Sequence, residues 1–223
     1  MLIAIIGMLD EREEGLRLLK NHIEARGHKT ALIDITIGTG AIDPTLEADV
    51  SCDELARTGG STIEEIKGLP TKERNKATSV MAEGLRKKLL DLHQNGELQG
   101  VVAVGGMTGS LISLPSMKSL PFGIPKLLIT SVAAMPANAK SFSDFFGMRD
   151  ITVMHSVVDT VGMNPFVQTL MTNGAGAICG MVEGFAPAKE EEQPSIAITE
   201  WGYCDMGAHY IRTLLEEKYN VVS

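Results

Sequence analysis

Short apolar runs alternate with amphipathic segments along the first part of the chain. The continuous apolar run at residues 2–6 predicts a strand that is covered on both faces. Residues 11–26 carry apolar side chains at helical spacing, and residues 30–35 form the next apolar run. Together these segments predict a β-α-β unit with a right-handed crossover.

The alternation continues after a long excursion. Residues 36–70 are rich in Gly, Thr, Asp and Pro but contain short helical patterns, and an excursion of this length in a compact domain is usually functional. Residues 71–95 then predict one long helix. Strands are expected at residues 101–104 and 126–130, with a short helix over residues 108–117 between them.

Later segments are less regular. A short strand is indicated at residues 150–155, and residues 165–182 predict a helix that is interrupted at the small residues 173–177. The end of the chain then repeats the pattern of its start, because the run at residues 196–199 matches residues 3–6 and is again followed by a helical segment.

We therefore expect an α/β protein with a Rossmann-like three-layer parallel sheet and the start of a second Rossmann-like domain at the C-terminus. The expected divisions are a first domain at 1–189, a linker at 190–194 and an incomplete βαβ domain at 195–223. A two-stranded fragment buries too little apolar surface to be stable alone. The last unit would therefore belong to a truncated chain, pack onto the first domain, or be completed by a separate polypeptide.

Composition narrows the choice of partners and compartment. The formal net charge of -8 argues against nucleic acid as a partner. No apolar run is long enough to span a bilayer, so no membrane association is expected. Cys52, Cys179 and Cys204 are widely spaced and form no metal-ligand pattern. We expect a cytoplasmic protein without a metal site.

The strongest candidate for a ligand contact is the glycine loop, residues 105–110. It follows the apolar run 101–104 and contains Gly105, Gly106, Thr108, Gly109 and Ser110. Ligands bind where a parallel strand ends and a helix begins, glycine lets the backbone approach closely, and N–H groups at a helix start favour an anion. No Walker lysine follows. A tight strand-to-helix turn without a ligand is the structural alternative.

Other predicted strands should end at the same edge of the sheet. This adds Gly7, Asp10, Asp34, Thr130 and Ser131 to the candidate ligand contacts. An acidic residue in the position of Asp34 can hold a ribose hydroxyl, or it can be a solvated carboxylate at the strand end. The loop after Gly7 lacks the GxGxxG spacing of a NAD site.

His155, Ser156 and Asp159 lie close together in the sequence. This order suggests a hydrolase, but no GxSxG elbow is present and nothing in the sequence gives the three residues the geometry of a triad. We favour a structural role for them. If the protein is an enzyme, Asp10, His155 and Asp159 are the candidates for acid–base catalysis.

Several short motifs follow one another along the chain in a specific order. They are Gly7 with Asp10, Gly59-Gly60-Ser61, Met81-Ala82-Glu83-Gly84, Gly105-Gly106-x-x-Gly109, Leu120-Pro121-x-Gly123-x-Pro125-Lys126, Asp150-Ile151, Ser156-Val157-Val158-Asp159, Gly162-x-Asn164 and Asn173-Gly174-Ala175-Gly176-Ala177. In these motifs the chain resembles the first half of proteins of the Tm-one-like ATP-binding family (the tomato mosaic virus resistance protein family).

The resemblance implies two Rossmann-like domains, ATP or a related nucleotide near the interdomain cleft, and a homodimer. It implies no particular reaction. Where the family has Thr-Lys after the first Asp, this chain has Glu11-Arg12, so a basic residue that can contact phosphate is kept.

Two functions from different classes are compatible with these residues. The first is an ATP- or nucleotide-binding protein whose ligand lies at the glycine loop and faces an interdomain cleft, with enzymatic activity left open. The alternative is a non-catalytic dimeric interaction module in which the glycine loop is structural.

Overall fold

The computed structural model describes residues 1–10, 12–38, 43–132, 135, 142–143, 145, 149–186 and 193–222. The chain divides into two units, Met1–Phe185 and Ala186–Ser223.

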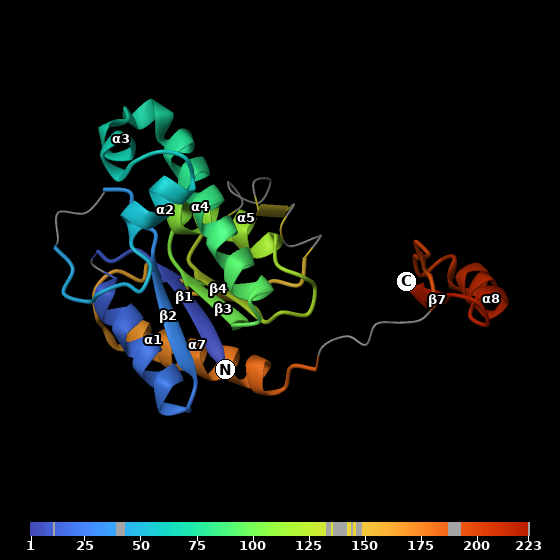
Figure 1. The fold of residues 1–223 in the computed structure, drawn as a ribbon. Coiled ribbons are helices and arrows are strands. Elements are labelled where there is room, and N and C mark those ends of the chain that lie inside the picture. Colours follow the sequence, from blue (N-terminus) through green and yellow to red (C-terminus); the bar gives the residue numbers. More distant parts are fainter. Residues whose placement is uncertain are drawn as a thin grey trace. The chain divides into compact units, whose positions relative to one another are not determined.

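In the first unit, the apolar runs of the sequence form one sheet whose strands are all parallel (Figure 1). The strands are β1 (Leu2–Gly7), β2 (Lys29–Asp34), β3 (Leu98–Val104), β4 (Lys126–Thr130) and β5 (Thr152–His155). Their order in the sheet is β2-β1-β3-β4-β5. The expected α/β class with a Rossmann-like parallel sheet is confirmed.

Alternate residues of β1 enter two separate cores, because successive side chains of a strand point to opposite faces. Ile3 and Ile5 pack in one core, and Ala4 and Ile6 pack in the other. Helices α1 (Glu13–Ala25) and α7 (Pro165–Glu183) cover the first face, and α2 (Cys52–Thr58), α4 (Arg74–Gln94) and α5 (Met107–Lys118) cover the second (Figure 1). The sheet therefore has a helical layer on each side.

The helices follow the predicted ranges with one correction. The predicted long helix is α4, preceded by the short 3-10 turn Thr71–Glu73, and the excursion before it contains α2 and α3 (Ile63–Gly68). The predicted interruption at residues 173–177 is wrong, because α7 runs through them without a break. A Cβ at Gly174 would lie 2.5 Å from the Ile129 side chain, so this glycine lets the helix approach the sheet closely.

The second unit is a small βαβ element. It consists of β6 (Ser195–Ala197), α8 (Asp205–Leu215) and β7 (Asn220–Val222), and the two strands pair in parallel. Within residues 193–222, nothing more of a second Rossmann-like domain is present than this small sheet and its helix. Residues 190–192 of the expected linker lie outside the described residues.

Among the described helices, none combines the length and apolar character needed to cross a membrane.

Candidate functional site

The carboxyl ends of four neighbouring strands bring most of the predicted ligand contacts to one edge of the sheet. In the register of the sheet, Gly7 lies beside Asp34, and Thr130 lies beside His155. The strand order changes direction between β1 and β3, and open parallel sheets bind ligands in the crevice at such a switch point. The loops after Gly7 and Val104 flank this position.

The glycines of the loop after β3 differ in what surrounds them. A Cβ at Gly105 would lie 3.1 Å from the Gly109 Cα, so these two glycines allow a close backbone approach between the strand end and α5. A Cβ at Gly106 would meet nothing within 4 Å. Gly106 therefore faces open space at the edge where a ligand is expected.

Helix α5 begins directly after Gly106 without a side-chain cap. Its first intrahelical hydrogen bond is donated by Ser110 N to Gly106 O, so the N–H groups of Met107, Thr108 and Gly109 precede that bond. Such N–H groups, with the positive end of the helix dipole, favour an anion.

Two of the predicted hydroxyl contacts face each other. The side chains of Ser110 and Thr130 are fully buried, and their oxygens lie 2.9 Å apart. Their hydrogen bond ties α5 to the end of β4. Thr108 and Ser131 are half-buried, so their side chains retain accessible surface at this edge.

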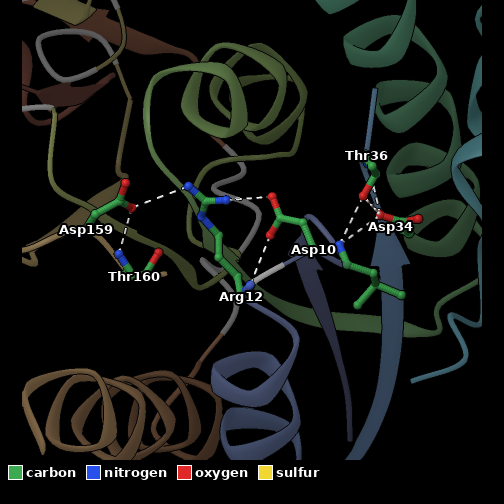
Figure 2. Close-up of polar contacts among 7 residues, drawn as sticks. Asp10, Arg12, Asp34, Thr36, Asp159 and Thr160 are labelled. Carbon is green, nitrogen blue, oxygen red and sulfur yellow. Dashed lines mark hydrogen bonds and ion pairs between the residues drawn. The ribbon is translucent and has the colours of Figure 1, made fainter. Parts of the chain in front are cut away.

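Asp10 holds an arginine at the switch point (Figure 2). One oxygen of its buried carboxylate accepts a hydrogen bond from Arg12 N at 3.0 Å, and the other accepts one from Arg12 Nη1 at 2.6 Å. Arg12 Nη2 lies 3.4 Å from Oδ1 of Asp159, on the loop after β5. The guanidinium therefore links the loop after β1 with the loop before α7.

This arrangement leaves polar groups without partners. Within the described part of the chain, the buried Nε of Arg12 and the buried Oγ1 of Thr160 make no hydrogen bond. Thr160 N donates to the same Asp159 oxygen that faces Arg12, at 2.7 Å (Figure 2). Buried polar groups in folded proteins are nearly always satisfied, so a ligand or an ordered water is the expected partner here.

Asp34 fixes the conformation of the loop after β1. Its Oδ1 accepts hydrogen bonds from Leu9 N at 3.2 Å, from Thr36 N at 2.9 Å and from Thr36 Oγ1 at 2.5 Å (Figure 2). The side chain is buried, which excludes the solvated carboxylate considered from the sequence. The nearby Cys52 thiol is affected by this carboxylate. Burial of the thiol itself and the negative charge of Asp34 raise the pKa of Cys52 to about 11, so this thiol stays protonated at neutral pH.

The sequence neighbours His155, Ser156 and Asp159 form no triad. His155 is exposed, and the Ser156 hydroxyl donates to the carbonyl oxygen of Val158 at 2.7 Å. No hydrogen bond joins any two of these three side chains within the described residues. This agrees with the structural role that we favour for Ser156.

The turn after β5 is strained. Val157 has a φ of +64°, which is rare for a β-branched residue, and its side chain is exposed. Strained backbone of this kind clusters at functional sites.

Sequence reasoning did not find Thr36 and Thr160. Thr160 is connected to Arg12 through Asp159, which lies 147 positions from Arg12 in the chain, and no local pattern signals such a contact. The basic character of Arg12 was visible in the sequence, but its two carboxylate partners were not identified as such.

The chain has relatives in bacteria and in a plant. Residues 1–187 match the N-terminal domain of UPF0261, an uncharacterised protein family. A UPF0261 protein of Clostridium tetani is 32% identical over 215 residues, which cover 96% of this chain and 50% of the relative. A UPF0261 protein of Rhizobium meliloti is 29% identical over 203 residues, which cover 90% of this chain and 46% of the relative.

The plant relative agrees with the resemblance drawn from the motifs. It is the ToMV resistance protein Tm-1(GCR237) of Solanum lycopersicum, 26% identical over 206 residues, which cover 85% of this chain and 26% of that protein. The chain spans about half the length of the bacterial relatives it matches.

Proposed function

We propose that this chain, which belongs to the uncharacterised protein family UPF0261, binds ATP or a related nucleotide through its phosphates at the carboxyl edge of the parallel sheet. The observation that carries the proposal is Arg12. Its side chain is 15% exposed and belongs to the loop after β1, which flanks the switch point, and its buried Nε makes no hydrogen bond within the described residues. Arginine is well suited to phosphate because its planar donors match the phosphate oxygens.

The start of α5 provides the second half of the proposed phosphate site. The helix has 12 residues, its N-terminus has no side-chain cap, and the space beside Gly106 is open. In this proposal the backbone N–H groups of the glycine loop bind one part of the phosphate chain and Arg12 binds another.

The other predicted residues divide into two roles. Thr108 and Ser131 are half-buried and are proposed as direct contacts. Ser110, Thr130 and Asp34 are buried and hydrogen-bonded within the protein, so they are proposed to shape the edge. ATP as the ligand is supported by the family resemblance of the motifs.

Calorimetric titration with ATP, ADP and inorganic phosphate tests the proposal. Arg12→Gln removes a hydrogen bond to a charged group, which is worth about 1.5–3 kcal/mol, so affinity for ATP should fall roughly 10- to 150-fold. Gly106→Val places a side chain in the open space beside the loop and should weaken binding by a similar factor.

Two matched variants control for charge and size. Arg17→Gln removes an arginine that pairs with Glu13 on the same helix, and Gly176→Val adds the same side chain at a glycine with nothing within 4 Å. Both should bind ATP as the wild type does. Unchanged affinity in Arg12→Gln would exclude the proposed phosphate contact.

The alternative function is an interaction module without a nucleotide. The close contact between Gly105 and Gly109 favours it, because that contact explains these two glycines without a ligand. It requires that no nucleotide binds the wild type, and that Gly106→Val changes stability alone.

A further inference from the structure

A small cavity of the first unit lies between α3, the start of α4 and the segment that follows β2. Its volume is about 150 Å³, and the buried apolar residues Ile37, Ile66 and Ala77 contribute to its wall. Lys67 and Arg74 also line it, and both residues are exposed. The cavity therefore combines an apolar wall with two positive charges.

These two positive charges have no counter-charge in the protein. Lys67 lies in the last turn of α3, and Arg74 is the first residue of α4. Within the described residues, neither side chain makes a hydrogen bond or an ion pair, whereas Arg57 and Arg86 each pair with a carboxylate of their own helix. Like charges that line one cavity repel each other, so an anion between them would be favourable.

Gly38 explains how the lysine comes to line the cavity. Its φ is +82°, a conformation that favours glycine. A Cβ at Gly38 would lie 2.5 Å from Cγ of Lys67, so the missing side chain lets the lysine stem cross the backbone here. Lysine commonly lays its apolar stem along protein surface and keeps its ammonium accessible.

The cavity adjoins the carboxyl edge of the sheet, and α3 lies on the side where the strands end (Figure 1). Ile35, which follows β2, has its Cδ1 3.9 Å from the position of a Cβ at Gly109, at the start of α5. Ile37 and Gly38 continue from there into the cavity wall. Ligand pockets usually measure about 300–1,000 Å³, so this cavity suits a smaller molecule than a nucleotide.

We infer that this cavity binds a short-chain aliphatic carboxylate. The carboxylate accepts hydrogen bonds from Lys67 and Arg74, whose planar guanidinium matches a carboxylate well. The hydrocarbon chain lies against Ile37 and Ile66 and removes apolar surface from water. Inorganic phosphate would satisfy the charges but would leave this apolar wall uncovered. The inference does not depend on nucleotide binding, because the proposed phosphate contacts are other residues.

Methyl NMR of the full chain tests this inference. The protein is labelled with ¹³C in its isoleucine methyl groups, Ile37→Val and Ile66→Val assign two resonances, and butyrate is added. We expect saturable shifts of both resonances, with a dissociation constant on the order of 1 mM for so small a ligand. Butyramide has nearly the same shape without the charge and should bind at least about tenfold more weakly.

Variants identify the two cations. Lys67→Gln and Arg74→Gln should each weaken butyrate binding by about tenfold, since each removes a hydrogen bond between charged groups. Both residues are exposed, so circular dichroism should show an unchanged fold. Lys72→Gln removes an exposed lysine of the connection between α3 and α4 that does not line the cavity, and it should leave the affinity unchanged.

Four results would overturn the inference. The first is that butyrate leaves the Ile37 and Ile66 resonances unshifted. The second is equal affinity for butyrate and butyramide, which would exclude a role for the charges. The third is tighter binding of inorganic phosphate than of butyrate, which would assign the cavity to a phosphate group. The fourth is an equal loss of affinity in Lys72→Gln, which would indicate a general effect of net charge.

Discussion

The ion pair between Arg12 and Asp159 joins two loops of the candidate site, and it is the weaker of the two contacts that hold the guanidinium. The Asp159 carboxylate is 58% exposed and lies 3.4 Å from Nη2, whereas Asp10 lies 2.6 Å from Nη1 and is buried. An exposed pair of this kind contributes about 1 kcal/mol at most. A phosphate that approaches Arg12 would therefore displace Asp159 and leave Asp10 in place.

Asp159→Asn should consequently strengthen ATP binding. Removing a competing charge worth up to about 1 kcal/mol raises affinity by up to roughly fivefold, measured by calorimetric titration. Glu14→Gln, an exposed residue of the first turn of α1, makes the same change in net charge and should have a smaller effect. A loss of affinity in Asp159→Asn would contradict displacement and indicate that Asp159 itself helps to hold the ligand.

At the scale of single residues, the sequence predicted which residues lie at the carboxyl edge of the sheet, but not the contacts among them. Asp34 ends one apolar run and Gly106 follows another. The carboxyl ends of parallel strands lie at one edge of the sheet, so the position of both residues could be predicted. The bond between Ser110 and Thr130 depends on the approach of α5 to β4, which is a property of packing. Local sequence patterns carry no information on such contacts.

At the scale of elements, a buried lysine fixes the start of β4. Lys126 is fully buried, and its Nζ donates to the carbonyl oxygens of Pro121 and Ile124 and to Asp150 Oδ1, at 2.8, 2.9 and 2.9 Å. Asp150 also accepts from Gly123 N at 2.7 Å. The pair therefore ties the connection between α5 and β4 to the segment that leads into β5.

The same pair should make stability depend on pH. Burial opposes ionisation of Asp150, but the hydrogen bonds from Lys126 and Gly123 outweigh it and hold the pKa of Asp150 below its ordinary value of 3.8. Because the folded state has the lower pKa, the ionised carboxylate stabilises the fold above this ordinary value. That contribution is lost as the pH falls through the folded pKa.

Asp150→Asn should lower the free energy of unfolding at neutral pH by about 3 kcal/mol, since it leaves a buried ammonium without its counter-charge. It should also reduce the loss of stability on acidification, measured by urea unfolding at several pH values. Asp53→Asn removes the charge that pairs with the exposed Arg57 and should cost about 1 kcal/mol or less. Equal effects of the two substitutions would exclude a special role for the Lys126 pair.

The elements themselves were largely predictable, for a physical reason. Strands buried on both faces must be apolar throughout, and helices that cover a sheet must be apolar on one side, so both patterns are visible in the sequence. The continuity of α7 was not predictable from the sequence. Gly174 resembles a helix breaker in the sequence, and only its contact with Ile129 explains why a glycine stands within the helix.

At the scale of the whole molecule, the two units differ in how much apolar surface they bury. The first unit has two cores, one on each face of its sheet. In the second unit, Ala208 is the one buried hydrophobic side chain among the described residues. Since apolar burial is the main stabilising contribution to a fold, the second unit should be far less stable by itself.

Equilibrium unfolding in urea should therefore show two transitions. Trp201 belongs to the second unit, so tryptophan fluorescence reports that unit, whereas far-ultraviolet circular dichroism is dominated by the helices of the first. We expect the fluorescence midpoint at the lower urea concentration, because the second unit buries less apolar surface. Two probes with different midpoints would indicate that the two units unfold separately. Trp201→Phe should leave the dichroism transition unchanged. Coincident midpoints would contradict separate unfolding of the two units.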